Sequence, residues 1–513
     1  MLNRRKNLIY KLGSLSLCVV VLASSCSKKL DTNLNDPNGL PIYNVKPYQL
    51  FSQALLATVT NKVGANVSSA TTNNQYAQEW MGYLARQKGW SAAGLGAHIQ
   101  SYALSFSDAN GTWQSLYHNI YDYNYVMTDS TANSILVGAA RLMRAMVFQD
   151  LVDQFGNIPY SQAGQPLAVQ TPKYDSATAI YKSLVAQVDS AITEINNSQG
   201  TSEDITDVMF KGNKASWLAF ANTIKLRLLL RQVPNVYQAT DPYIVGELSN
   251  VSAQGGFLGA GQDALINPGF KDAALQQSPF WADFGFLPGA SASSPYSNGI
   301  QVQNSSYYGA NNIMLDSLQN TSDPRAWYFY DTTATQGALI GNAEGAGSNI
   351  ASFIGLGTLQ SASAPALLLS ASQSLFMQAE AAQRGMISGS AATFYKQAVE
   401  ESFRYLGVPN AGSTADNFMT SSTSGSVNFS ISTNPINTIL FQKWIAECEL
   451  DPIEAFCDYR RTGLPAIYPS GASLVPQKRL LYPETEYINN SANVNAQGMS
   501  QQSATAIKIF WGQ

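Results

Sequence analysis

Apolar side chains recur at helical spacing over much of the chain. In SATAIYKSLVAQVDSAITEI, residues 176–195, they lie three or four positions apart, which is the spacing of one face of an α-helix. The same spacing recurs in residues 142–155 and 217–228. The pattern predicts amphipathic helices whose apolar stripes face a common core. In the first stretch the stripe consists of Ala177, Ile180, Tyr181, Leu184, Val188, Ile192 and Ile195.

Residues 375–407 have the pattern of a helical hairpin. LFMQAEAAQRG is followed by AATFYKQAVEESFRYLG, with Gly385 and Gly407 where the two helices should stop. The hairpin is similar to a tetratricopeptide-type unit, although no strict period of about 34 residues runs through the chain. Helix pairs of this kind bury a continuous core only against neighbours. We therefore expect a mainly α fold of stacked, tetratricopeptide-like helix pairs (an α-α superhelix) with few short strands.

Residues 250–365 differ in composition from the rest of the chain. They are rich in Gly, Ser, Asn, Ala and aromatic residues, as in SPFWADFGFLPGASASSPYSNG. Loops this long in a compact protein are usually functional or disordered, and the aromatic content argues against disorder. We expect an ordered, loop-rich and aromatic-rich insertion laid over the helical scaffold of a single domain, residues 46–513.

The N-terminus has the pattern of an export signal. A basic segment, MLNRRKNLIYK, precedes the uncharged apolar run 12–23, which is too short to span about 30 Å of hydrocarbon. The run ends in LASSC, and a cysteine directly after small residues resembles a bacterial lipobox. We expect a lipoprotein signal peptide over residues 1–25, a lipid on Cys26 and a tether over residues 26–45. The alternative is a soluble secreted protein in which Cys26 merely follows the cleavage site.

Charge and cysteine content narrow the class of protein further. The net charge is −4, with 30 Lys and Arg against 34 Asp and Glu. The charged residues of the expected signal peptide are all basic, so the chain without it is more acidic. A nucleic-acid-binding protein needs clustered basic residues to neutralise phosphates, so we expect no nucleic-acid partner. Besides Cys26, Cys448 and Cys457 are the cysteines that follow the signal. They could form one disulfide or stay as two buried thiols.

The sequence offers little catalytic or metal-binding chemistry. Its two histidines, His98 and His118, lack the His-Glu-x-x-His spacing of a metalloprotease. No G-x-S-x-G motif is present, and the Gly-rich runs lack the strand, helix and Lys of a phosphate loop. A carboxylate pair for glycoside hydrolysis stays open, because its members can lie far apart in a sequence. We expect no metal and no cofactor, and these residues give little support for an enzyme.

The stretch EAFCDYRRTGLP, residues 454–465, combines two arginines with a helix stop. Arg460 and Arg461 could form an anion-binding cluster, or they could clamp the end of a helix that stops at Gly463. Cations near a helix C-terminus favour its dipole and can bond its last carbonyls. We expect the two arginines to be structural clamps. Nearby carboxylates that could pair with them are Glu447, Glu449, Asp451 and Glu454.

Several stretches together resemble a known family. The C-terminal hundred residues contain ILFQKWIAECELDPIEAFCDYRRTGLP, VPQKRLLYPETEYINN and IKIFWGQ, which look like the C-terminal signature of SusD/RagB-type nutrient-binding outer-membrane lipoproteins. NLNDPNG, LVDQFGNIPYSQA, TSDPRAWYFY and FMQAEAAQRG precede them in the family's order. The resemblance spans nearly the whole chain, and the N-x-D-P-N segment places it nearest the SusD-like subgroup. Phe456 and Cys457 depart from the residues common in the family.

The resemblance implies a function as well as a fold. It implies a lipid-anchored protein on the outer face of the outer membrane of a Bacteroidetes-type bacterium. Such a protein captures glycan or another oligomeric nutrient and passes it to a SusC-like, TonB-dependent transporter, without being an enzyme. Two other functions stay open: a lipid-anchored polysaccharide hydrolase, and a helical-repeat adaptor that binds peptides.

Exposed aromatic residues would carry the binding of a glycan. In the family, sugars stack on such rings, and nearby amides and carboxylates bond their hydroxyls. Packing of each ring on the protein's own scaffold is the alternative. We expect Trp113, Tyr117 and Tyr121, which recur at helical spacing, to belong to the core. The candidate ligand-binding residues are Trp80, Tyr83, Trp90, Trp281, Tyr296, Asn298, Tyr307 and Tyr308.

Overall fold

The structure is a computed structural model of the chain. None of the helices in its described parts is both long and apolar enough to cross a membrane. The expected signal peptide, Cys26 and nearly all of the tether lie outside the described residues. These are residues 45–63, 75–87, 95–128, 134–164, 169–200, 206–234, 241–249, 251, 255–288, 307–332, 337–343, 351–468, 475–500 and 503–512.

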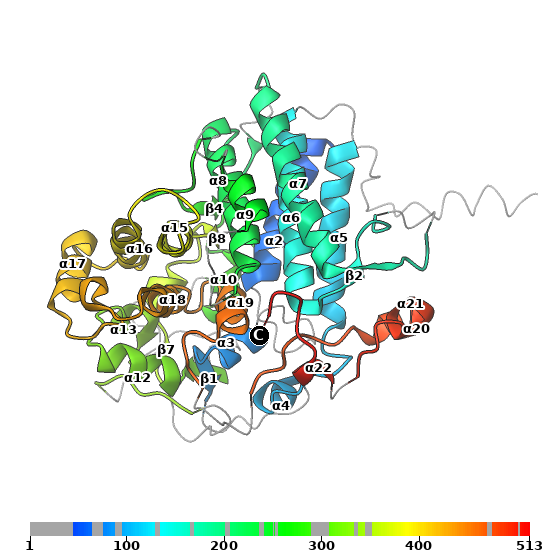
Figure 1. Ribbon diagram of the computed structural model, residues 1–513. Coiled ribbons are helices and arrows are strands. Elements are labelled where there is room, and N and C mark those ends of the chain that lie inside the picture. Colours follow the sequence, from blue (N-terminus) through cyan, green and yellow to red (C-terminus); the bar gives the residue numbers. More distant parts are fainter. Residues whose placement is uncertain are drawn as a thin grey trace, which may run out of the picture.

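Long helices stand side by side and form the larger part of the molecule (Figure 1). Consecutive helices pack against each other, α5 on α6, α6 on α7 and α7 on α8, while α2 packs on α5. All seven residues of the predicted stripe in 177–195 are buried. The predicted mainly helical fold of stacked helix pairs is therefore confirmed. The bounds are α2 Pro47–Val63, α5 Asn110–Thr128, α6 Ser134–Phe155, α7 Ala177–Asn197, α8 Lys214–Arg231 and α9 Pro242–Leu248.

The predicted hairpin is present as α15 and α16. Gly385 and Gly407 both have the positive φ that glycine tolerates best, 70° and 77°, and each follows the last helical turn. The first helix is buried along nearly its whole length because α16 and α18 cover it. The bounds in this region are α15 Ala371–Gln383, α16 Ala391–Tyr405, α17 Ala411–Ser421, η4 Phe429–Ile431, α18 Pro435–Ala446 and α19 Pro452–Thr462.

Short helices and paired strands lie around this scaffold. The described part of the insertion holds such elements between its loops, in keeping with the expected ordered, loop-rich segment. Each sheet is an antiparallel pair: β1 with β5, β2 with β3, β4 with β8 and β6 with β7. The strands are β1 Leu84–Arg86, β2 Ile158–Pro159, β3 Tyr174–Asp175, β4 Ala264–Ile266, β5 Tyr308–Ala310, β6 Tyr330–Asp331, β7 Phe353–Ile354 and β8 Ala366–Leu369. The short helices are α3 Gln75–Trp80, α4 Leu95–Gln100, α10 Pro279–Phe284, α12 Asn312–Asn320, α13 Ala326–Phe329, α14 Leu356–Leu359, α20 Glu484–Asn489, α21 Ser491–Asn495 and α22 Ser503–Ala506.

The two arginines of α19 join distant parts of the chain. Arg461 is buried and pairs with Glu380 of α15 at 2.8 Å and with Asp458 at 2.7 Å. Arg460 donates to the carbonyl oxygens of Asp153 (2.7 Å) and Lys478 (3.1 Å). The expected clamping role is what these contacts show. The prediction that carboxylates in residues 447–454 would pair with these arginines was wrong. The bonds go instead to α15, to α6 and to Asp458 of the same helix.

The two body cysteines are separate thiols. Cys448 and Cys457 are both free and buried. Burial raises the pKa of Cys457 to about 12, although Arg231 and Arg460 oppose that shift. Of the two possibilities left open by the sequence, the structure has the buried thiols.

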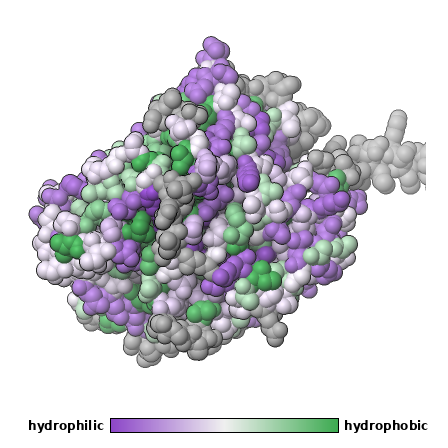
Figure 2. Space-filling model, viewed as in Figure 1, coloured by the Kyte–Doolittle hydropathy of each residue, from purple (hydrophilic) through white to green (hydrophobic). Residues whose placement is uncertain are grey.

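The visible surface mixes residue types in small groups. Figure 2 shows hydrophilic and hydrophobic residues interspersed over the face drawn in Figure 1. Among the residues coloured on this face, the hydrophobic ones lie in small groups and form no large apolar patch that would mark a binding surface.

Candidate functional site

Trp80 and Tyr83 lie in the core. Neither side chain is exposed. The indole of Trp80 donates to the carbonyl of Ile99 at 2.9 Å, and the hydroxyl of Tyr83 donates to the carbonyl of Trp444 at 2.6 Å. The ring of Tyr83 also stacks on Trp444 of α18. Elements distant in sequence cover both rings, so neither offers a face to a ligand.

The insertion buries two more of the candidate aromatic residues. Trp281 and Tyr308 are nearly inaccessible, and the guanidinium of Arg86 lies 5.0 Å from the centre of the Tyr308 ring. Tyr307 is half-buried and packs against the core. Packing on the protein's own scaffold, the alternative stated for each ring, thus holds for Trp80, Tyr83, Trp281 and Tyr308. Trp90, Tyr296 and Asn298 lie outside the described residues.

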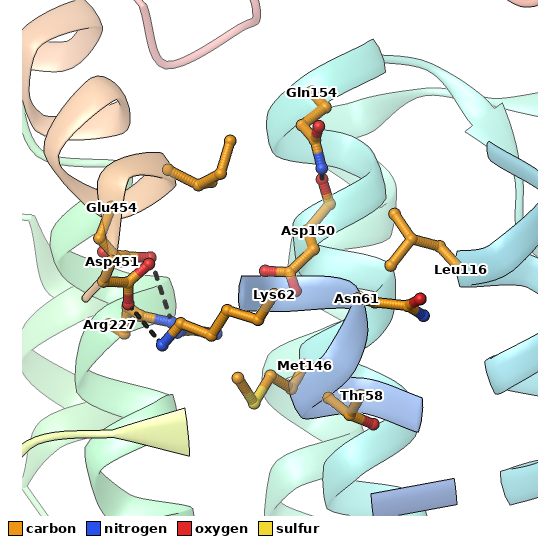
Figure 3. Close-up of a pocket in the computed structure, with 11 residues that line it drawn as sticks. Thr58, Asn61, Lys62, Leu116, Met146, Asp150, Gln154, Arg227, Asp451 and Glu454 are labelled. Atoms are coloured by element: carbon orange, nitrogen blue, oxygen red, sulfur yellow. Dashed lines mark hydrogen bonds and ion pairs between the residues drawn. The ribbon is translucent and has the colours of Figure 1, made fainter. Parts of the chain in front are cut away.

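A small cavity lies between α2, α5, α6, α8 and α19. Charged side chains converge on it (Figure 3): Lys62 pairs with Asp451 at 2.8 Å and Arg227 with Glu454 at 3.6 Å. Burial raises the pKa of Asp150, which also lines it, to about 7, and the positive charge of Arg227 partly opposes this. The volume is about 20 Å³, room for roughly one water molecule. The cavity belongs to the structural charge network and is too small for a nutrient.

A wider hollow borders the insertion beside α2 and α10. Its volume is about 680 Å³, and proline, leucine and alanine side chains make up much of its lining. Phe270 is the aromatic residue among the described residues that line it, and the amide of Gln277 donates to Asp272 and to the carbonyl of Phe286. Thr60, Gln276, Gln277 and Asp283 also line it, but a single ring is a small platform on which to stack a sugar.

A third hollow, which we call the aromatic cleft, lies between α5, the described residues of the β2–β3 connection (160–164 and 169–173) and α20. These elements lie on the same side of the molecule in Figure 1. The cleft is open to solvent and has a volume of about 380 Å³. Ligand sites typically combine an apolar lining with a few placed polar groups in a concavity of this size. The lining residues are Trp113, Tyr117, Tyr121, Pro159, Gln162, Ala163, Gly164, Val169, Gln170, Pro172 and Glu486.

Three rings of α5 form the floor of the cleft. Trp113, Tyr117 and Tyr121 follow one another four positions apart, so successive rings are displaced by about 6 Å along the helix. Trp113 is buried against four other aromatic rings. The hydroxyl of Tyr117 donates to the carbonyl of Pro159 at 2.6 Å, which fixes its ring. Core placement was the correct prediction for Trp113, but Tyr117 and Tyr121 are half-buried and line an open cleft.

The wall from the β2–β3 connection is held against α5. Both oxygens of the Asp175 carboxylate accept hydrogen bonds from Ser161, which shape the start of the connection. Gly164 has φ +84°, and a Cβ placed there would lie 2.3 Å from the amide nitrogen of Asn124 on α5. Glycine adopts this backbone angle without strain, and any larger residue would also have to displace the Asn124 side chain.

The carboxylate of Glu486 supplies the charged group of the cleft. The hydroxyl of Tyr174 donates to its Oε2 at 2.8 Å, and the amide of Asn490 donates to the same atom at 3.1 Å. The Asn490 amide also bonds the carbonyl of Pro172 at 2.9 Å. These bonds tie α20 to the connection across more than 300 residues of sequence and hold the carboxylate in place.

Sequence reasoning missed the polar part of this site. Gln162 and Glu486 lie in LVDQFGNIPYSQA and VPQKRLLYPETEYINN, stretches that served only to indicate the family. Nothing in the sequence brings them together with α5. In the described parts of the chain, no group of three or more His, Cys, Asp or Glu side chains is placed to hold a metal ion.

Comparisons with known proteins match nearly the whole chain. A SusD-like family model, described as starch-binding and associating with the outer membrane, matches residues 40–241 and 286–483. No curated protein matches the chain. Among solved structures, a chitin-binding protein has 23% identity and a TM-score of 0.70, covering 91% of this chain and 100% of its own.

Two further solved structures have the same fold. A SusD/RagB family protein from Bacteroides thetaiotaomicron has 18% identity and a TM-score of 0.72, covering 92% of this chain and 100% of its own. A chitin-binding SusD homologue from Flavobacterium johnsoniae has 21% identity and a TM-score of 0.68, covering 90% of this chain and 97% of its own. The TM-scores show that these proteins share the fold, and at identities this low the likeness shows the fold alone.

Proposed function

The chain belongs to the SusD-like family, and on that premise we propose that it captures a glycan at the cell surface and delivers it to a SusC-like, TonB-dependent outer-membrane transporter. The family description names starch binding and the outer membrane. Two solved structures of the same fold are named for binding chitin. These names favour a carbohydrate over a peptide as the nutrient.

The observation that carries the proposal is the chemistry of the aromatic cleft. Tyr117 and Tyr121 offer half-buried rings, which match the apolar face of a sugar ring. The carboxylate of Glu486 and the amides of Gln162 and Gln170 stand around these rings, and such groups bond hydroxyls. A floor of rings and a border of acceptors and donors is what a neutral oligosaccharide needs.

The cleft suits binding better than hydrolysis. Hydrolysis of a glycosidic bond generally uses two carboxyl groups about 5–10 Å apart. Among the described residues that line the cleft, Glu486 is the one carboxylic acid. We therefore propose a binding protein that is not an enzyme, and turnover of a glycan by the purified protein would instead favour the hydrolase.

The proposed anchor is a lipid on Cys26, with the body on the outer face of the membrane. The basic segment, apolar run and LASSC sequence support it. Replacing Cys26 with alanine should release the protein from the outer-membrane fraction, and retention there would contradict the anchor. Wild-type protein from gently solubilised membranes should carry a large transporter with it; isolation of the protein alone would argue against the partnership.

Calorimetry with neutral oligosaccharides tests capture at the cleft. Tyr121→Ala should weaken binding by about fivefold, because a ring contact contributes about 1 kcal/mol. Tyr48→Ala is the matched control: Tyr48 is also half-buried but lies on α2 and does not line the cleft. Equal affinities for wild type and Tyr121→Ala would exclude the cleft as the site. Binding of peptides but not of oligosaccharides would favour the adaptor.

A further inference from the structure

The described lining of the aromatic cleft contains an acidic residue and no basic residue. Among the described residues that line it, Glu486 is the only carboxylic acid, and none is basic. The buried Arg479 lies 4.6 Å from the centre of the Tyr482 ring and does not line the cleft either. A ligand in the cleft therefore meets negative charge.

The carboxylate of Glu486 is built into the site and is not a freely moving surface group. Its Oε2 accepts from the Tyr174 hydroxyl and the Asn490 amide. An ionised carboxylate offers about four acceptor positions, so it retains capacity for a donor on a ligand. Because its neighbours fix it, a ligand does not have to order the side chain on binding.

The charge of Glu486 also acts on the aromatic rings that form the floor of the cleft. Burial raises the pKa of Tyr117, and the Glu486 carboxylate contributes further to that rise. The electron-rich faces of Trp, Tyr and Phe rings attract cations as well. In the cleft such faces and a fixed carboxylate stand together, which is the combination that recognises an ammonium group.

We propose that the aromatic cleft selects a glycan with a protonated amine, an amino sugar of the glucosamine type, at the unit next to Glu486. This inference rests on the proposed capture of glycan at the cleft. The sugar ring packs on Tyr117 and Tyr121, and its ammonium group donates to the Glu486 carboxylate. Anionic glycans, such as uronic acid polymers, are repelled by the same carboxylate.

Calorimetry with oligosaccharides of equal length tests the inference. The probes are oligomers of glucosamine, N-acetylglucosamine, glucose and galacturonic acid, at about pH 6, where a carboxylic acid is ionised and an amine is protonated. The glucosamine oligomer should bind about tenfold more tightly than its N-acetylated form, the effect of one charged hydrogen bond. The galacturonic acid oligomer should bind most weakly.

Two variants show whether the preference comes from this carboxylate. Glu486→Gln keeps an acceptor for Tyr174 but removes the charge, so the tenfold preference for the glucosamine oligomer over its N-acetylated form should disappear. Glu484→Gln is the matched control, because it removes the same charge from α20 at a side chain that does not line the cleft. For the wild type, raising the salt concentration should diminish the preference.

The outcomes separate the inference from the proposed function. Binding of neutral oligomers without an amine preference would overturn the inference alone, as would a preference that persists in Glu486→Gln or in high salt. If none of the four oligomers binds, the proposed capture of glycan at the cleft fails together with the inference.

Discussion

Replacing Arg461 with alanine removes the cation that holds α19 to α15. The guanidinium makes two bonds to Glu380, at 2.8 and 2.9 Å, and one to Asp458 at 2.7 Å. It also donates to the carbonyl of Val233 at 3.1 Å. The residue is 1% exposed. Its loss leaves two buried carboxylates with fewer partners and a space where the side chain packed.

The expected loss of stability follows from these contacts. Removing one partner of a buried ion pair typically lowers the free energy of unfolding by about 3–5 kcal/mol. Glu380 keeps Arg384 at 2.8 Å, and Asp458 keeps Lys443 at 2.5 Å. Because each carboxylate keeps one cation, we expect a loss of stability at the lower end of this range, about 3 kcal/mol. None of the partners of Arg461 lines the aromatic cleft, so the folded variant should keep its affinity for glycan.

The loss should depend on pH in a definite direction. Burial by itself would raise the pKa of Glu380, but Arg461 and Arg384 outweigh it and lower the pKa. For Asp458, Lys443, Arg461 and Arg231 outweigh burial in the same way. A lowered carboxyl pKa stabilises the fold above the pKa of the unfolded chain, about 4, and this stabilisation is lost as the pH falls. The difference in the free energy of unfolding between wild type and Arg461→Ala should therefore become smaller as the pH falls below about 4.

Urea denaturation followed by tryptophan fluorescence measures the effect. Lys396→Ala is the control, because Lys396 is about half exposed and pairs with Glu400 and Asp416 at the surface, where such pairs contribute about 0–1 kcal/mol. A double-mutant cycle of Arg461→Ala with Glu380→Ala should give a coupling energy of about 1–3 kcal/mol. A loss in Arg461→Ala no greater than that in Lys396→Ala would refute the clamping role.

Three further predictions address other parts of the fold. Burial raises the pKa of Glu449 to about 8, so the folded protein retains a proton that the unfolded chain releases near pH 4.5. Between these two pH values the free energy of unfolding should fall by up to about 1.4 kcal/mol per pH unit. Glu449→Gln should make it depend less on pH, as measured by urea denaturation at a series of pH values. Gly164→Ala should displace the wall of the cleft, lowering glycan affinity in calorimetry more than it lowers thermal stability, and adding Asn124→Ala should restore part of the affinity by removing the clash. Trp511→Phe should lose the bond from the indole to Asp153 at 3.1 Å and lower the free energy of unfolding by about 1–3 kcal/mol; an unchanged urea midpoint would contradict it.

Local patterns in the sequence were sufficient to predict the helices and the family. The apolar stripe of α7 and the glycine stops of the hairpin depend on residues within a few turns of one another. The stretches that indicated the family are likewise continuous in the chain, and the family model matches residues 40–241 and 286–483. Interactions of short range along the chain could therefore be predicted from the sequence alone.

Only the tertiary structure decided which aromatic rings face the solvent. Helical spacing places Trp113, Tyr117 and Tyr121 on one face of α5, but it does not say what covers that face. Trp80 has the same amphipathic chemistry, yet other elements bury it. The cleft instead depends on bonds such as that from Tyr174 to Glu486, separated by 312 residues. Exposure is set by contacts between elements far apart in the chain, and for this reason the sequence determined the scaffold while the folded structure determined the site.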